Sequence, residues 1–196
     1  MTTIYFIRHA EADSANPDSR NRPLTEKGLN DRALVTAYLQ DKGIDAILSS
    51  PFKRAVDTVA DFADSKGLEV LLSEDFKEHN TISDNYPDYE YFPFIKKYWA
   101  GFLYKVPGDE SLHELQERNI AALIDALTKY KDKNIVIGTH GMALSTIIRY
   151  YDPTYGFADF MAMVKIKPWI VQMSFSGVAC AGMEKIDLFE KTGMLK

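Results

Sequence analysis

The sequence contains only one cysteine, Cys180, in 196 residues. A single thiol excludes an intramolecular disulfide, and it also excludes metal clusters and redox motifs that need two or more cysteines. Cys180 lies in the apolar run 178–181, where an inert buried thiol is expected more often than a nucleophile. The chemistry of the chain must therefore come from other residue types.

The sequence also lacks an excess of positive charge and any long apolar run. Its net charge is -5 and its pI is near 5.4, whereas nucleic-acid surfaces carry clustered Lys and Arg. No run approaches the roughly 20 apolar residues that span a bilayer. The short N-terminal apolar run reaches Arg8 at once and has no basic region before it, unlike a signal peptide. We expect no nucleic-acid partner, no membrane partner and a cytoplasmic location.

What is present is typical of a globular protein, with 46% hydrophobic and 26% charged residues. A chain of this length can bury a substantial core within one domain. We find no repeat, low-complexity tract or linker that would divide it. The sequence therefore predicts a single domain over residues 1–196.

Apolar runs of strand length alternate with segments of helical periodicity from the start of the chain. The predicted strands lie at 4–7, 46–48, 69–72 and 134–138. Thr25, Pro51 and Ser111 or Asp109 open predicted helices, and Gly43 ends the first of them. Two further apolar runs, 169–175 and 178–183, predict a hairpin at one side of the sheet. This order predicts a three-layer α/β/α sandwich with a mixed, mostly parallel sheet.

The segment 73–108 interrupts this alternation with a high density of aromatic residues. Pro87 and Pro93 fragment it, although a short helix around 92–103 fits the pattern. We interpret the segment as an aromatic-rich cap insertion at about 73–108. Packing as a satellite on the core and covering a pocket are compatible interpretations.

Polar residues of one kind follow three of the predicted strands. Arg8 and His9 follow the first, Arg54 lies just beyond the second, and His140 follows the fourth. Because the carboxyl ends of parallel strands meet at one edge of a sheet, these side chains are expected to converge. Two arginines and two histidines suit a phosphoryl dianion, and the helix after Gly141 can add its N-terminal N–H groups.

These motifs resemble the signature segments of the histidine phosphatase superfamily, also called the phosphoglycerate mutase-like family. The signature segments are Arg8-His9-Ala10, the LSSPxxRAxxT pattern at 48–58 and Gly138-Thr139-His140-Gly141, and segments at 23–28, 76–78 and 108–111 also resemble common parts of the family. Ala10 stands where the family more often has glycine, and alanine is a frequent variant at this position. The resemblance implies a phosphoglycerate mutase-like fold and favours the phosphatase branch.

Carried over to this chain, the resemblance implies that His9 is phosphorylated during turnover. Arg8, Arg54 and His140 would then bind the phosphoryl oxygens, with His140 more useful when protonated. Glu78 takes the position of the family acid, which would protonate the leaving alkoxide and later deprotonate the attacking water.

Two choices within this site are open at the level of sequence. His79 is the local rival of Glu78 as the acid, and Asp75 is a poorer one. For the loop residue that contacts phosphate, Asn16 is the first choice and Ser14 the second. The spacing of Asp, Glu and His indicates no metal triad, and the family chemistry requires no metal and no cofactor.

The sequence therefore predicts a phosphomonoester hydrolase that acts on a small phosphorylated substrate through phosphohistidine. The alternatives are a phosphoglycerate mutase, a protein phosphohistidine phosphatase and a non-catalytic phosphate-binding module. A mutase needs several cations to hold a bisphosphorylated intermediate, whereas the insertion is dominated by aromatics. The compact protein phosphatases lack a long cap, and a decayed binding module would be expected to lose His9. The sequence specifies neither the natural substrate nor an oligomeric state.

Overall fold

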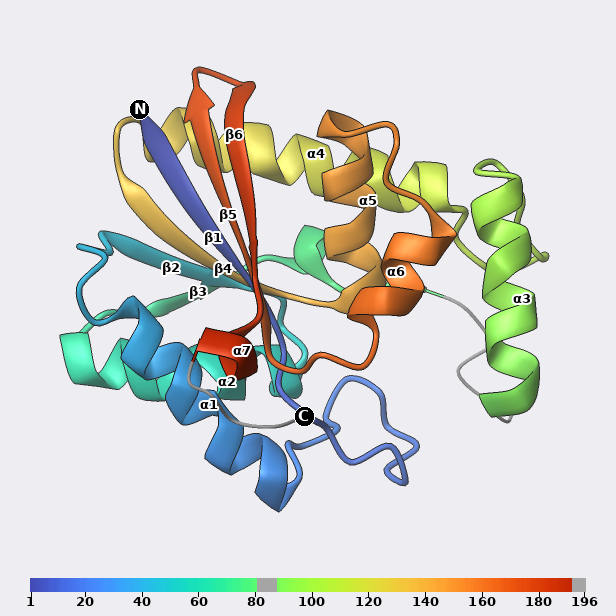
Figure 1. Ribbon diagram of the computed structural model, residues 1–196, viewed down its shortest axis with the longest axis horizontal. Coiled ribbons are helices and arrows are strands. Elements are labelled where there is room, and N and C mark those ends of the chain that lie inside the picture. Colours follow the sequence, from blue (N-terminus) through green and yellow to red (C-terminus); the bar gives the residue numbers. More distant parts are fainter. Residues whose placement is uncertain (81–87, 192–196) are drawn as a thin grey trace.

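The computed structural model describes residues 1–80 and 88–191. Within them, one six-stranded sheet has the order β3-β2-β4-β1-β5-β6 (Figure 1). The strands are β1 Thr2–Arg8, β2 Ala46–Ser49, β3 Val70–Leu72, β4 Asn134–Thr139, β5 Trp169–Ser176 and β6 Ala179–Ile186. The pairs among β1 to β4 are parallel, whereas β5 and β6 run antiparallel at one side. The mostly parallel mixed sheet and the C-terminal hairpin are thus confirmed.

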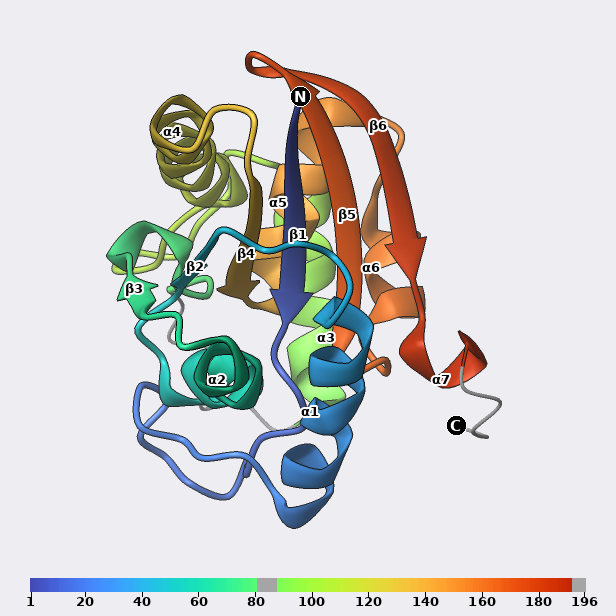
Figure 2. The ribbon, with the colours of Figure 1, turned by 90° about the vertical axis from the view of Figure 1, so that its left-hand side faces the viewer.

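Helices cover both faces of this sheet, which confirms the three-layer α/β/α sandwich (Figure 2). They are α1 Glu26–Leu39, α2 Lys53–Lys66, α3 Asp88–Ala100, α4 Leu112–Lys129, α5 Gly141–Tyr151, α6 Phe157–Met163 and α7 Leu188–Lys191, with a 3-10 turn η1 at Glu74–Phe76. One face packs on α1, α2 and α7, and the other packs on α4, α5 and α6. No helix in residues 1–80 and 88–191 is both long and apolar enough to cross a membrane.

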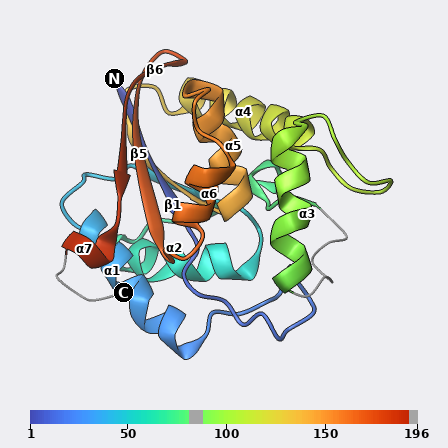
Figure 3. The same ribbon diagram turned by 45° about the vertical axis from the view of Figure 1, so that its right-hand side comes forward.

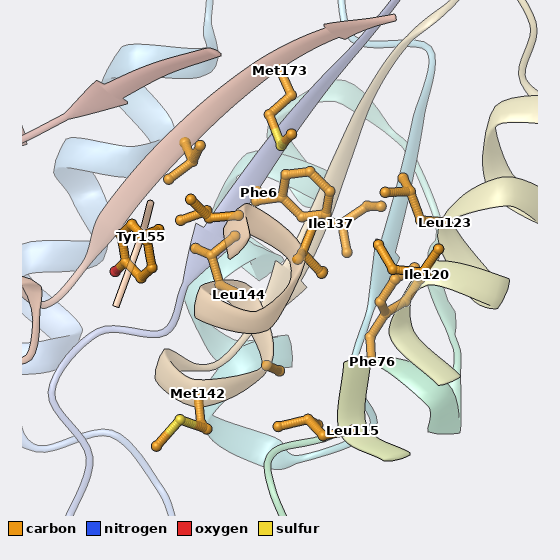
Figure 4. Packing of buried hydrophobic residues seen from close by; sticks show 14 of the residues in the cluster. Phe6, Phe76, Leu115, Ile120, Leu123, Ile137, Met142, Leu144, Tyr155 and Met173 are labelled. Atoms are coloured by element: carbon orange, nitrogen blue, oxygen red, sulfur yellow. The ribbon is translucent and has the colours of Figure 1, made fainter. Parts of the chain in front are cut away.

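The apolar run at the start of the chain is buried on both faces of the sheet. Ile4 and Phe6 belong to the core under α4 and α5, whereas Tyr5 and Ile7 belong to the core on the α1 and α2 face. Figure 4 shows Phe6 packed among side chains of the first core, beside Ile137 of β4. Because successive residues of a strand point to opposite faces, a central strand needs apolar residues at every position.

The register of the parallel strands brings their carboxyl ends level. Arg8, the last residue of β1, pairs with Thr139, the last of β4, and Ser49 at the end of β2 pairs with Gly138. α2 and α5 begin just beyond these ends. Residues that follow the three strands are therefore held within one small region.

Two helix starts agree with the expected capping residues, whereas Pro51, expected in the first turn of α2, precedes the N-cap residue Phe52. Thr25 Oγ1 accepts the Gly28 N–H at 3.0 Å, and Ser111 rather than Asp109 caps α4 in a reciprocal pair with Glu114. The first helix ends at Leu39, before the expected Gly43. The short helices α6 and α7 were not expected.

The aromatic segment contributes to the main core. Its helix α3 begins earlier than expected, at Asp88, and contains Pro93 (Figure 3). Ile95, Tyr98 and Trp99 are buried in the same cluster as Phe76. This part of the segment thus packs into the main core, whereas residues 81–87 of the expected cap lie outside the described residues.

Candidate active site

The His9 ring is held by the end of β1 and by the strand beside it. His9 is 8% exposed, and its backbone N–H donates to the Thr139 carbonyl oxygen at 3.1 Å. Its Nδ1 lies 2.6 Å from the carbonyl oxygen of Ala10. Because a carbonyl oxygen can only accept, Nδ1 carries the proton of the neutral ring and Nε2 keeps its lone pair.

Burial and charge keep the His9 ring neutral. Its pKa is lowered well below the usual 6.5, first because the ring is buried and then because Arg54 and Arg8 lie near it. A second cation next to arginine is unfavourable, and so is a charge removed from water. At neutral pH the ring is therefore in the form that can attack an electrophile.

The Arg8 guanidinium is fixed by the turn between α6 and β5. Its Nη1 donates to the carbonyl oxygens of Met163 at 2.9 Å, Val164 at 3.0 Å and Ile166 at 2.9 Å. Gly141 packs against the guanidinium, because a Cβ atom built there would lie 3.3 Å from Nε and 3.4 Å from Nη2. The glycine thus lets the start of α5 approach Arg8 closely.

Arg54 lies in the first turn of α2 and is 5% exposed. Its Nη1 donates to the carbonyl oxygen of Ser19 at 2.5 Å, and its guanidinium lies 4.9 Å from the centre of the Phe52 ring. In Figure 1 the segment between β1 and α1 passes beyond the carboxyl end of β1, and Ser19 belongs to that segment. Arg54 therefore connects the loop to the start of α2.

His140 is fully buried at the N-cap position of α5. Its Nε2 lies 2.7 Å from Ser50 Oγ, and its ring meets the His9 ring edge to face, with centroids 5.3 Å apart. Nδ1 has no hydrogen-bond partner among the residues that the structure describes. The pKa of His140 is lowered well below 6.5 by burial and then by Arg54, so the charges of the protein itself favour a neutral ring, contrary to the expected imidazolium.

The Glu78 carboxylate lies at the N-terminus of α5, the helix whose N-cap residue is His140. Oε1 accepts the backbone N–H groups of Ala143 at 3.0 Å and His79 at 2.9 Å, and Oε2 accepts that of Met142 at 3.2 Å. Two N–H groups of α5 that were expected to be available to phosphate thus donate to Glu78. Of the residues at this helix start, Gly141 is the one left for the predicted phosphate contact.

The rival acid and the two loop candidates are placed differently. The Nε2 of His79 lies 2.6 Å from the backbone oxygen of Glu110, which it can only approach as a donor. Asn16 Oδ1 accepts the Asp18 N–H at 2.9 Å, within the loop itself. Ser14 is exposed. Asn16 and Ser14 as phosphate contacts stay predictions.

The arrangement brings together two arginines, two neutral histidines and a carboxylate at one sheet edge, which suits phosphoryl chemistry. A family model described as histidine phosphatase superfamily (branch 1) matches residues 4–162. The chain belongs to the histidine phosphatase superfamily. In the described part of the chain, no group of three or more His, Cys, Asp or Glu side chains could hold a metal ion.

Individual relatives of this superfamily member carry two kinds of name. The uncharacterized phosphatase PhoE of Bacillus subtilis is 28% identical over 154 residues, covering 76% of this chain and 76% of the relative. The probable phosphoglycerate mutase GpmB of Yersinia pestis is 28% identical over 158 residues, covering 76% of this chain and 74% of the relative. Phosphatases and mutases are both enzymes, so membership of the superfamily supports an enzyme.

A solved structure supports the fold over nearly the whole chain. Phosphoserine phosphatase from Entamoeba histolytica, in complex with 3-phosphoglyceric acid, has a TM-score of 0.77 and 22% sequence identity. The match covers 96% of this chain and 99% of that chain. The phosphoglycerate mutase-like fold is therefore confirmed.

The sequence did not reveal the groups that hold the candidate site in place. Thr58 Oγ1 accepts the Ala10 N–H at 2.9 Å and donates to the Arg54 carbonyl oxygen at 2.7 Å, so one buried hydroxyl joins the two motifs. Ser50, which contacts His140, directly follows β2. Both lie in the quoted 48–58 segment, whose spacing was the available signal. The backbone carbonyl groups that hold Arg8 have no such signal, because any residue supplies a carbonyl.

Proposed function

We propose that this histidine phosphatase hydrolyses a phosphomonoester, without a metal ion, through a phosphohistidine intermediate on His9. The observation that carries the proposal is the bond from His9 Nδ1–H to the Ala10 carbonyl oxygen. It directs the Nε2 lone pair of a neutral ring away from the backbone, beside the cations Arg8 and Arg54 that lower the pKa of His9. A nucleophile next to fixed cations is what transfer of a charged phosphoryl group requires.

In the first step, Nε2 of His9 attacks phosphorus and the bond from phosphorus to the leaving oxygen breaks. Arg8 and Arg54 hold the phosphoryl oxygens and offset their charge. A neutral His140 whose Nε2 accepts from the Ser50 hydroxyl carries its proton on Nδ1, which can donate to the same group. Glu78, in its protonated form, gives its proton to the leaving oxygen, since an alkoxide is a poor leaving group near neutral pH.

In the second step, water attacks the phosphorus of phospho-His9 and the N–P bond breaks. The Glu78 carboxylate accepts the proton of that water, so inorganic phosphate leaves and both side chains return to their starting forms. The N–H groups of Met142 and Ala143, at the start of the helix that His140 caps, hold the Glu78 carboxylate in place for this second step.

A mutase reaction is the second candidate, because relatives named probable phosphoglycerate mutase match this chain as well as a phosphatase does. In that reaction phospho-His9 would return its phosphoryl group to a substrate hydroxyl instead of water. Lys96 and Lys97, exposed on α3, are cations within the predicted cap segment 73–108. The cap role of that segment and the cytoplasmic location also stay predictions.

The test is phosphate release from a panel of phosphomonoesters in the presence of a chelator, with conversion of 3-phosphoglycerate to its 2-isomer followed in parallel. Hydrolysis without isomer formation is expected. Isomerisation with little free phosphate would make the protein a mutase, and activity that the chelator abolishes would overturn the metal-free mechanism. No phosphate release and no isomerisation would contradict the proposal and would favour a phosphoprotein substrate or phosphate binding alone.

A further inference from the structure

The backbone that carries Glu78 is held from behind by one arginine. Arg118 of α4 donates Nη1 to the carbonyl oxygens of Asp75 at 2.7 Å and Lys77 at 3.0 Å. Its Nη2 donates to the carbonyl oxygen of Glu78 itself at 3.0 Å. Three carbonyl groups within four consecutive residues are therefore bound to a single guanidinium.

The remaining donors of this guanidinium bind one carboxylate. Nε lies 2.6 Å from Oε1 of Glu110 and Nη2 lies 2.9 Å from Oε2, and both side chains are largely shielded, at 16% and 14% exposed. A guanidinium has five N–H donors in a planar fork, and each donor of Arg118 has an acceptor here. All five N–H groups of the Arg118 guanidinium are thus hydrogen-bonded.

Glu110 binds the far end of the same segment. Its backbone N–H donates to the Asn80 carbonyl oxygen at 2.9 Å, and its Oε2 accepts the Asn80 N–H at 3.2 Å. Its own carbonyl oxygen lies 2.6 Å from Nε2 of His79. Arg118 and Glu110 therefore fix the chain before, at and after Glu78.

The side chain of Glu78 points the opposite way, to the start of α5. Its carboxylate accepts the N–H groups of Met142 and Ala143, two and three residues after His140. The carboxylate position is set at one end by α5 and at the other end by Arg118 of α4 and Glu110, which precedes α4. A shift of about 1 Å at a reacting group can cost about 100-fold in rate.

We propose that Arg118, through its fork to three backbone carbonyl oxygens and its pairing with Glu110, is the positioning residue for the Glu78 acid. This inference rests on the proposed function, because it presumes that Glu78 transfers the proton. In this role Arg118 acts through Glu78. Because Glu78 also serves in the second step, which is the same for every substrate, the selective effect of Arg118 is expected in kcat/KM, which reports the steps up to loss of the leaving group.

Arg118→Lys is the informative variant. Lysine keeps the positive charge, which also contributes to the field at His140, but it has three donors on one atom and cannot reproduce the fork. We expect kcat/KM for alkyl phosphates to fall by up to about 100-fold. We expect kcat/KM for p-nitrophenyl phosphate, whose leaving group needs little protonation, to change by less than about 3-fold.

Arg32→Lys is the matched control. Arg32 also projects from a helix and binds one carboxylate and one carbonyl oxygen, those of Asp61 and Asp57. It joins α1 to α2, and none of its described hydrogen bonds or ion pairs reaches the segment that carries Glu78. Arg32→Lys should lower the activity on neither alkyl phosphates nor p-nitrophenyl phosphate. Glu110→Gln repeats the test, because glutamine keeps the shape of the Glu110 side chain but removes the charge that pairs with Arg118. This variant replaces Arg118→Lys if the lysine variant does not fold.

Glu78→Gln, measured alongside, separates the inference from its premise. If Glu78→Gln lowers kcat/KM selectively for alkyl phosphates but Arg118→Lys and Glu110→Gln do not, the positioning role is wrong and the acid role stands. If Glu78→Gln lowers kcat/KM equally for both substrates, the acid role fails, and the positioning role fails with it. An equal loss of kcat/KM on both substrates in the folded Arg118 and Glu110 variants would also overturn the inference, since it would indicate a general structural role.

Discussion

The rings of His9 and His140 meet edge to face with their centroids 5.3 Å apart. Each ring is anchored on a different side, His9 through Nδ1 to the Ala10 carbonyl oxygen and His140 through Nε2 to Ser50 Oγ. Burial and the same arginine, Arg54, lower the pKa of both rings. Two neutral imidazoles thus stand beside fixed guanidinium charges, an arrangement with direct consequences for pH dependence.

The first prediction concerns catalysis below pH 6.5. Because the pKa of His9 is lowered, its ring stays neutral as the pH falls below the usual histidine value, and activity is lost only when the pH falls through the lowered pKa. We expect the acid limb of kcat/KM for p-nitrophenyl phosphate that belongs to His9 to lie well below pH 6.5. A loss of activity at pH 6.5 or above, coinciding with protonation of the His9 ring in an NMR titration, would contradict this assignment.

The second prediction concerns stability over the same pH range. The unfolded chain binds protons on both histidines below about pH 6.5, whereas the folded chain binds them only at lower pH. Stability is therefore fully present above 6.5 and falls as the pH is lowered, by up to about 1.4 kcal/mol per pH unit for each ring. Urea unfolding at pH 7.5 and 5.5 measures this loss. The His9→Asn, His140→Asn double variant should lose less; an equal loss would refute the linkage to these rings.

The third prediction concerns Thr58, the buried hydroxyl between the first two motifs. Thr58→Val removes the acceptor of the Ala10 N–H and leaves that group buried, so we expect a loss of about 1–3 kcal/mol in the free energy of unfolding. The kcat should fall too, because Ala10 orients the His9 ring. Thr58→Ser keeps the hydroxyl and is the control. Comparable stability of the valine and serine variants would show that the hydroxyl contributes little.

The fourth prediction concerns Gly141, which packs against Arg8. A Cβ atom at this position would lie 3.3 Å from Arg8 Nε, closer than most side-chain contacts, so Gly141→Ala should displace the guanidinium. A weakened charge-assisted bond corresponds to about a 10-fold rise in the inhibition constant of inorganic phosphate. Gly156→Ala, where the nearest atom is 3.9 Å away, is the matched control. Unchanged phosphate inhibition in Gly141→Ala would remove Arg8 from the proposed phosphate contacts.

Patterns that depend on burial and local capping were predictable from the sequence. The central strands β1 and β4 need apolar residues on both faces, so their runs locate them within about two residues. Thr25 and Ser111 cap helices through contacts three residues away, which sequence spacing records directly. The parallel order then required Arg8, His9, Arg54 and His140 to converge, although their roles stay predictions.

Features that depend on backbone atoms or distant packing were not predictable. The turn after α6 holds Arg8 through carbonyl oxygens, which carry no side-chain signature. Helix α3 begins at Asp88 and includes Pro93, because buried contacts of Ile95 and Tyr98 outweigh the local preference to break there. The neutral state of His140 follows from full burial, which its sequence neighbours do not reveal.

The proposed acid can be tested by varying the leaving group. Glu78→Gln keeps the size of the side chain but cannot supply the proton, so kcat/KM for alkyl phosphates should fall by about 100-fold or more. The kcat/KM for p-nitrophenyl phosphate should fall much less, because its leaving group is a weak base and kcat/KM does not include the later attack of water. His79→Gln is the control for the rival acid, and a selective loss there instead would transfer the role to His79.

The central claim is that His9 carries the phosphoryl group, and trapping the intermediate tests it most directly. The enzyme would be mixed with a phosphorus-32-labelled phosphomonoester, quenched in alkali within milliseconds and mapped by peptide mass spectrometry. The account predicts a label that is stable in alkali, labile in acid, located on the peptide containing His9 and absent from His9→Ala. Phosphate release by the wild-type enzyme with no label on that peptide would contradict it.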